Sequence, residues 1–180
     1  MSKSNTGNRT QLAHLVRRFF TSLGRTSPDV PDVIWAKGIL LEPEFELWEK
    51  MTPSDQRHSI AVAQMAGNEL PDDVTVVRAG LLHDVGKIAV RSGLITRVLA
   101  AITKPLVTQH RIDRWSRGKG PLATLGVFMA YPQLGASMLR EAGSDEFIVR
   151  WATEHHLPAA QWTVERTRAE VLQRADQFAV

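Results

Sequence analysis

Cysteine is absent from this 180-residue sequence. Its absence excludes disulfide bonds, zinc sites built on thiolates and enzymes that use a cysteine nucleophile. A chain without cysteine also suits a reducing compartment, so we expect a cytoplasmic protein. The hydrophobic fraction of 43% is enough for a packed core, and the length allows one domain with an extension.

Long uninterrupted apolar runs are also missing. Residues 1–10 are polar and are not followed by the apolar stretch of a secretory signal. The most apolar later stretch, 121–139, is broken by Tyr131, Pro132 and Gln133, so it fits a protein core better than a bilayer. We therefore expect neither a secretory signal nor a membrane partner.

The sequence has little of the strict apolar and polar alternation that marks β-strands. Apolar residues recur at helical spacing nearly throughout, which predicts an all-α fold. Residues 52–55 resemble a helix entrance, Asp72 and Asp73 can cap another helix, and Gly86 is expected to end that helix in the left-handed conformation. The expected helices cover 11–23, 43–49, a segment from the 52–55 entrance to about 68, a segment after Asp73 that ends at Gly86, 92–102, 133–141, 145–155 and 163 onward, with a turn-rich stretch over 25–32.

We divide the chain into an N-terminal helical extension, residues 1–42, and a main domain, residues 43–180. The net charge is only +3, but positive charge is concentrated in one segment. This segment holds a single acid, Asp113, and eight basic residues: Lys87, Arg91, Arg97, Lys104, Arg111, Arg114, Arg117 and Lys119. Such an excess suits an anionic ligand such as a phosphate or nucleotide, although a solvated helix face would have the same composition.

An imidazole and a carboxylate stand side by side at His83 and Asp84, where an apolar helix is expected to end. Inside a helix, adjacent side chains point about 100° apart, but the backbone can rearrange after the last turn. Both groups are ligands for divalent metals, and imidazole favours transition metals. Two ligands do not complete a coordination sphere, so distant helices must supply others. His58 and Asp176 are the candidates, since each lies on an apolar helix where an unpartnered polar group would be costly.

The ordered set His58, His83-Asp84 and Asp176 resembles the HD superfamily of metal-dependent phosphohydrolases. The resemblance implies an all-α bundle with one metal held by these four side chains. It implies a divalent Mn, Fe, Ni or Co ion, with Mg as a further option, and hydrolysis of a phosphate ester by a metal-activated water. In that scheme Asp84 and Lys87 are catalytic. The predicted substrate-binding residues are Lys87, His155, His156, Arg111 and Arg114.

Part of the sequence is similar to the binuclear branches of the superfamily, which include the HD-GYP and related cyclic-dinucleotide phosphodiesterases. The similarity covers Lys87, the segment from Tyr131 to Gly135, and the pair His155-His156. However, Tyr131 stands where those relatives place a second-metal histidine, and a neutral tyrosine is a poor ligand. We therefore expect one firm metal site, with His155 and His156 either near the substrate or holding a second ion weakly.

Three functions remain in competition. The first is a phosphohydrolase acting on a small phosphorylated molecule, a nucleotide or a cyclic mono- or dinucleotide. The second is a nucleotide-sensing or regulatory module that has lost turnover, against which the intact set of four ligands argues. The third is a helical nucleic-acid-binding domain that uses the basic segment, for which the sequence offers less support.

Overall fold

The computed structural model describes residues 27–89 and 131–179. Within these ranges the chain is all-α and contains no β-strand, as predicted. Two short 3-10 helices, η1 (Val85–Ala89) and η3 (Ala159–Gln161), accompany the α-helices. The α-helices are α2 (Val30–Ile39), α3 (Glu42–Glu49), α4 (Pro53–Glu69), α5 (Val74–Leu82), α9 (Tyr131–Glu141), α10 (Glu146–Glu154) and α11 (Arg166–Phe178).

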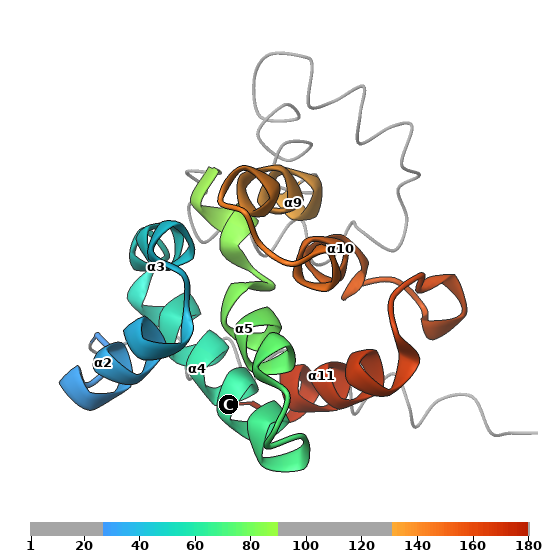
Figure 1. Ribbon diagram of the computed structural model, residues 1–180, viewed down its shortest axis with the longest axis horizontal. Coiled ribbons are helices and arrows are strands. Elements are labelled where there is room, and N and C mark those ends of the chain that lie inside the picture. Colours follow the sequence, from blue (N-terminus) through green and yellow to red (C-terminus); the bar gives the residue numbers. More distant parts are fainter. Residues whose placement is uncertain (1–26, 90–130, 180) are drawn as a thin grey trace, which may run out of the picture.

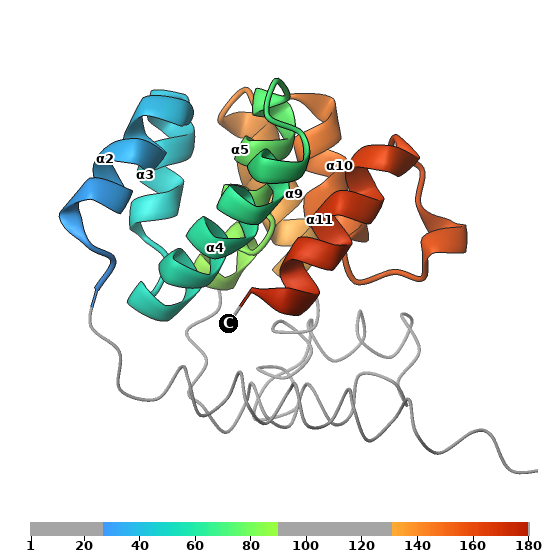
Figure 2. The ribbon, with the colours of Figure 1, turned by 90° about the horizontal axis from the view of Figure 1, so that it is seen from below.

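Helices α4 and α5 form the centre of the bundle. The views in Figures 1 and 2 place α2 and α3 on one side of this pair and α9 to α11 on the other. Gly80 of α5 lies against Ala63 of α4, where an added Cβ would come within 2.8 Å of the Ala63 Cα. The glycine therefore lets two helix backbones approach closely, and the neighbouring core side chains Leu81 and Leu82 are fully buried.

The helix starts follow the side chains that the sequence places there. The Thr52 hydroxyl accepts a hydrogen bond from the backbone N–H of Asp55 and begins α4, while Pro53 occupies the first turn. The Asp73 carboxylate accepts from the N–H of Val76 and begins α5 in the same way. These caps satisfy N–H groups that have no partner inside the helix, and they confirm the predicted starts.

Helix α2 begins inside the stretch that was expected to be turn-rich. Pro31 lies in its first turn, where the missing N–H costs nothing, and Asp32 in the same turn favours the helix dipole. The expectation of a turn across 25–32 is therefore wrong from Val30 onward. Ala36 of this helix is fully buried in the core, whereas the domain boundary at residue 42 stays a prediction.

Gly86 differs from its predicted role. Its φ is not positive, so it does not end α5 in the left-handed conformation. The structural reason for glycine is the close approach of α9: an added Cβ would lie 1.9 Å from the Tyr131 carbonyl oxygen and 2.8 Å from the Gly135 N. This contact brings Tyr131 next to the turn that follows α5.

A buried ion pair connects α3 and α5 to the turn before α10. Both oxygens of the fully buried Glu44 accept hydrogen bonds from Arg78, at 2.6 and 3.0 Å. The Ser144 hydroxyl donates to the same carboxylate at 2.7 Å, and the Leu41 N–H donates at 3.0 Å. Every lone-pair direction of the carboxylate is thus well supplied with donors, as a buried charge requires.

None of the described helices has the length and apolar character needed to cross a membrane. The helix predicted over 11–23 and the one predicted over 92–102 lie outside the described residues.

Candidate metal centre

His58 and Asp176 come from helices far apart in the sequence. Helix α11 packs across α4, and it brings the Asp176 Oδ1 to 2.8 Å from the His58 Nε2. The side chains keep 21% and 14% of their surface exposed, so the pair lies at the edge of the core rather than in its centre. Two residues proposed from sequence as ligands therefore contact each other directly.

His83 and Asp84 follow the last residue of α5, at the point where the helix gives way to a turn and then to η1. The His83 Nδ1 lies 2.8 Å from the Gly80 carbonyl oxygen, which can only accept, so Nδ1 carries the proton. In neutral His83 the lone pair is then on Nε2, which is buried and has no hydrogen-bond partner among the described residues. This nitrogen lies 3.5 Å from the Asp84 Oδ2 and 3.8 Å from the Asp176 Oδ1.

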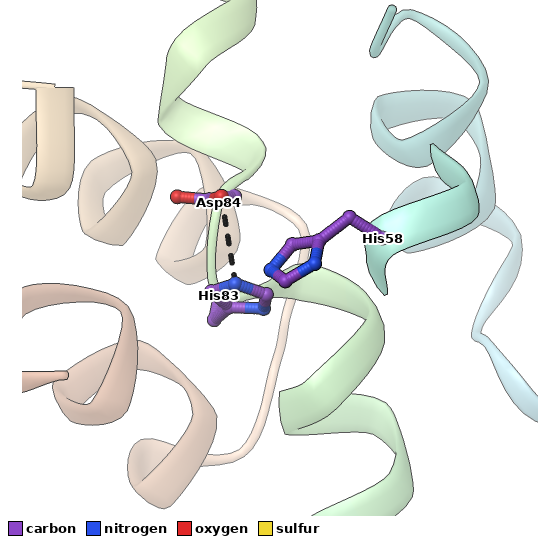
Figure 3. A group of neighbouring side chains, drawn as sticks. All are labelled: His58, His83 and Asp84. Atoms are coloured by element: carbon purple, nitrogen blue, oxygen red, sulfur yellow. Dashed lines mark ion pairs between the residues drawn. The ribbon is translucent and has the colours of Figure 1, made fainter. Parts of the chain in front are cut away.

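One ligand atom from each of His58, His83 and Asp84 falls within 4.8 Å of the others (Figure 3), and Asp176 adjoins them. A buried imidazole nitrogen that faces two carboxylate oxygens needs either a proton or a metal ion between them. A histidine whose Nδ1 donates to a backbone carbonyl is also the usual arrangement for a metal ligand through Nε2. The donor set of two imidazoles and two carboxylates thus fits a divalent metal ion.

Charges around Asp84 control its ionisation. Burial by itself would raise the pKa of this carboxyl, but the positive charges of Lys87 and His83 hold it well below 3.8. Burial likewise opposes the charged form of His83, yet the negative charges of Asp84 and Asp176 raise its pKa above 6.5. Asp84 is therefore an anion at neutral pH, as a ligand must be.

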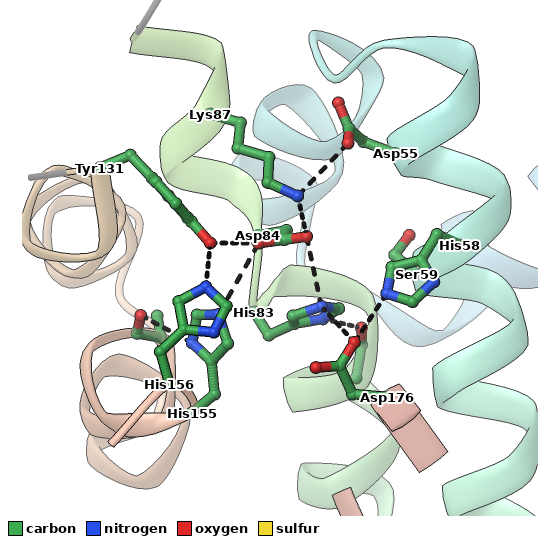
Figure 4. Close-up of polar contacts among 12 residues, drawn as sticks. Asp55, His58, Ser59, His83, Asp84, Lys87, Tyr131, His155, His156 and Asp176 are labelled. Atoms are coloured by element: carbon green, nitrogen blue, oxygen red, sulfur yellow. Dashed lines mark hydrogen bonds and ion pairs between the residues drawn. The ribbon is translucent and has the colours of Figure 1, made fainter. Parts of the chain in front are cut away.

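Lys87 reaches the same site from η1. Its ammonium group pairs with the Asp84 Oδ2 and lies 3.5 Å from the Asp55 Oδ1 (Figure 4). Asp55 was not among the site residues predicted from the sequence. Its position could have indicated it, because Asp55 precedes His58 by three residues, and this spacing puts both side chains on one face of α4.

A second group of possible ligands lies on the other side of Asp84. The atoms offered by Asp84, His155 and His156 fall within 4.8 Å of one another. The two histidines follow the end of α10, and the His155 Nδ1 is 3.1 Å from the Ala152 carbonyl oxygen. Its Nε2 is therefore a buried acceptor without a hydrogen-bond partner among the described residues, 3.7 Å from the Asp84 Oδ1.

Tyr131 lies inside this second group. Its hydroxyl donates to the Asp84 Oδ1 at 2.9 Å and contacts the His156 Nε2. The side chain is 4% exposed, and burial together with the negative charge of Asp84 raises its pKa well above 10. Tyr131, which differs from the histidine of the binuclear pattern, thus contacts the candidate ligands Asp84 and His156.

The predicted substrate-binding residues Arg111 and Arg114 lie outside the described residues. The structure brings together the other predicted site residues: His58, His83, Asp84, Lys87, His155, His156 and Asp176 (Figure 4).

The family model of the HD domain matches residues 56–180, a range that includes the four proposed ligands. Searches among curated proteins and among solved structures gave no significant match. The family match covers more than half of the chain and agrees with its all-α fold and with the His and Asp cluster. The chain belongs to the HD domain family, whose members are generally metal-dependent hydrolases.

Proposed function

We propose that this protein is a metal-dependent phosphohydrolase that binds one divalent transition-metal ion through His58, His83, Asp84 and Asp176. The observation that carries the proposal is the buried His83 Nε2, which faces the carboxylates of Asp84 and Asp176 and has no hydrogen-bond partner among the described residues. Two imidazoles in the donor set favour Mn, Fe, Ni or Co over Mg.

The proposed substrate is a small phosphorylated molecule, a nucleotide or a cyclic mono- or dinucleotide, in the cytoplasm. A divalent ion supplies Lewis-acid chemistry, in which a water molecule is acidified and the charge on phosphoryl oxygens is offset. The family match supports hydrolysis, and the basic segment that includes Arg111 and Arg114 suits an anionic substrate.

Lys87 is the described cation best placed to bind a substrate phosphate. Its ammonium group contacts Asp84 and is 3.5 Å from Asp55, and 18% of its side chain is exposed. An ammonium group at this position can also donate a charge-assisted hydrogen bond to a phosphoryl oxygen. Asp55 then keeps the ammonium group near the site.

His155 is better suited to a water molecule than to a phosphate. Its Nδ1 proton points at backbone carbonyls, so the neutral ring offers a lone pair at Nε2. That lone pair accepts a hydrogen bond from water and repels an anionic oxygen. A proton-accepting role next to Asp84 therefore fits this side chain.

The test is the metal content of protein purified without a metal-affinity tag, measured by elemental mass spectrometry. We expect about one transition-metal ion per chain in the wild type and loss of this ion in Asp84→Ala. The control is Asp72→Ala, which removes an exposed carboxylate and should retain the ion. A wild type that carries no ion and takes up none from added Mn²⁺ would refute the proposal.

Activity is then measured on a phosphomonoester, a cyclic mononucleotide and a cyclic dinucleotide. Lys87→Ala should keep the metal and lose turnover or substrate affinity, whereas Asp84→Ala should lose both metal and turnover. A protein that binds metal and nucleotide but hydrolyses none of these substrates would instead be a sensing module, and unchanged turnover in Asp84→Ala would refute the metal mechanism.

A further inference from the structure

Asp84 faces the buried Nε2 atom of a histidine on each side. Its Oδ2 is 3.5 Å from the His83 Nε2, and its Oδ1 is 3.7 Å from the His155 Nε2. Both histidines have their Nδ1 atoms at backbone carbonyls, so both present Nε2 to the carboxylate. Each side of Asp84 therefore offers imidazole and carboxylate ligands that could hold a cation.

The two sides differ in what fills the space. On the His83 side, the Asp84 Oδ2 is paired with the Lys87 ammonium group, which sits on a long side chain that keeps 18% of its surface exposed. On the His155 side, the Tyr131 hydroxyl bonds the Asp84 Oδ1 and contacts the His156 Nε2. A cation bound by the Asp84 Oδ1 and the His156 Nε2 would have to compete with the phenol oxygen for both of these atoms.

Tyr131 is also held firmly in this position. It is the first residue of α9, and its backbone carbonyl lies against Gly86 so closely that no side chain fits there. Its ring makes edge contacts with His156 and lies 5.7 Å beneath the Lys87 ammonium group. Moving the phenol out would break two hydrogen bonds and expose a buried ring.

We propose that Tyr131 excludes a second metal ion and restricts this centre to one ion, on the His83 side of Asp84. The inference deepens the proposed function and rests on it. The hydroxyl donates to Oδ1 and holds the carboxylate with Oδ2 on the His83 side, which is the role that a supporting hydrogen bond has for a metal ligand. Tyr131 is thus a positioning residue and a determinant of metal number.

Tyr131→His is the sharpest test. Imidazole is shorter than phenol, so the substitution vacates the position of the hydroxyl and adds a nitrogen lone pair to those of His155 and His156. We expect the metal content after saturation with Mn²⁺ to rise from about one ion per chain in the wild type to about two in the variant. Tyr131→Ala provides a second route, because it opens the same space and leaves three ligands.

The matched control is the double variant Tyr131→His with His156→Ala, which removes a ligand from the second group only. Its metal content should return to about one. Circular dichroism checks that each variant is folded, and isothermal titration separates the affinities of the two ions.

Two ions in the wild type would overturn this inference, since Tyr131 would then not exclude the second one. One ion in folded Tyr131→His and in folded Tyr131→Ala would overturn it as well. Either result would leave metal-dependent hydrolysis at this centre standing, because that proposal is tested separately by metal loss and turnover loss in Asp84→Ala.

Discussion

Gly86→Ala offers a stringent test of how the bundle positions the site. The new Cβ would lie 1.9 Å from the Tyr131 carbonyl oxygen, and an ordinary contact needs at least 3.4 Å. The opposing atoms belong to the backbone of α9, so the collision is relieved only if η1 or the whole helix moves. Overpacking that a flexible side chain can absorb costs about 1–3 kcal/mol.

Because the helix backbone cannot yield so easily, we expect Gly86→Ala to lower the free energy of unfolding by about 3 kcal/mol or more. For a chain of this size that corresponds to a fall in Tm of roughly 6–12 °C. The control is Gly38→Ala in α2, where an added Cβ meets nothing within 4 Å. That variant should be unchanged or stabilised by up to about 1 kcal/mol, because alanine favours a helix.

The assay is urea denaturation followed by circular dichroism, with both variants and the wild type in parallel. The chain contains a single tyrosine, so isotope-labelled tyrosine gives one set of ring signals in NMR spectra. We expect these signals to shift in Gly86→Ala, since α9 must carry Tyr131 away from Asp84. A variant within about 0.5 kcal/mol of the wild type, with unchanged tyrosine signals, would refute the close approach of η1 and α9.

Two further predictions concern charge. Glu44→Ala should lower the free energy of unfolding by about 3–5 kcal/mol in urea denaturation, because it leaves the Arg78 guanidinium without its buried partner. The control Glu146→Ala removes an exposed pair with Arg150 and should cost under about 1 kcal/mol. Equal effects of the two substitutions would contradict the structure. The pKa of His83 is raised above 6.5 in the metal-free protein, so its proton stabilises that state below about pH 6.5 and this stability is lost as the pH rises through the folded pKa. A metal ion must displace the same proton, so the affinity for Mn²⁺ in calorimetric titrations should rise by up to about tenfold per pH unit until His83 is deprotonated; an affinity that falls between pH 6 and 8 would exclude His83 as a ligand.

Local signals in the sequence account for most of the fold. Thr52 and Asp73 cap helices because their side chains bond N–H groups two or three residues away, and such contacts can be recognised without a structure. The first turn of α2 was missed because Pro31 in that turn and Pro28 just before it are as typical of turns as of helix starts.

The candidate ligands were also predictable as a set, because His83 and Asp84 are adjacent and follow an apolar helix. The contacts that these ligands make with residues distant in the sequence were not predictable. The hydrogen bond from Tyr131 to Asp84 joins residues 47 apart, and it exists only because Gly86 admits α9. The same holds for Glu44 and Arg78, which are 34 residues apart. Sequence spacing identified groups able to bind a cation, but the contacts that decide how many cations bind depend on tertiary packing.

The contact between His58 and Asp176 joins residues separated by 118 positions. An ion held by both would act as a covalent cross-link does in a secreted protein, since it would close a long loop in any partly unfolded chain. In the chain-entropy account, closing a loop of this length disfavours the unfolded state by about 4–5 kcal/mol. A chain without cysteine would thereby gain a reversible cross-link between α4 and α11 wherever the metal is present.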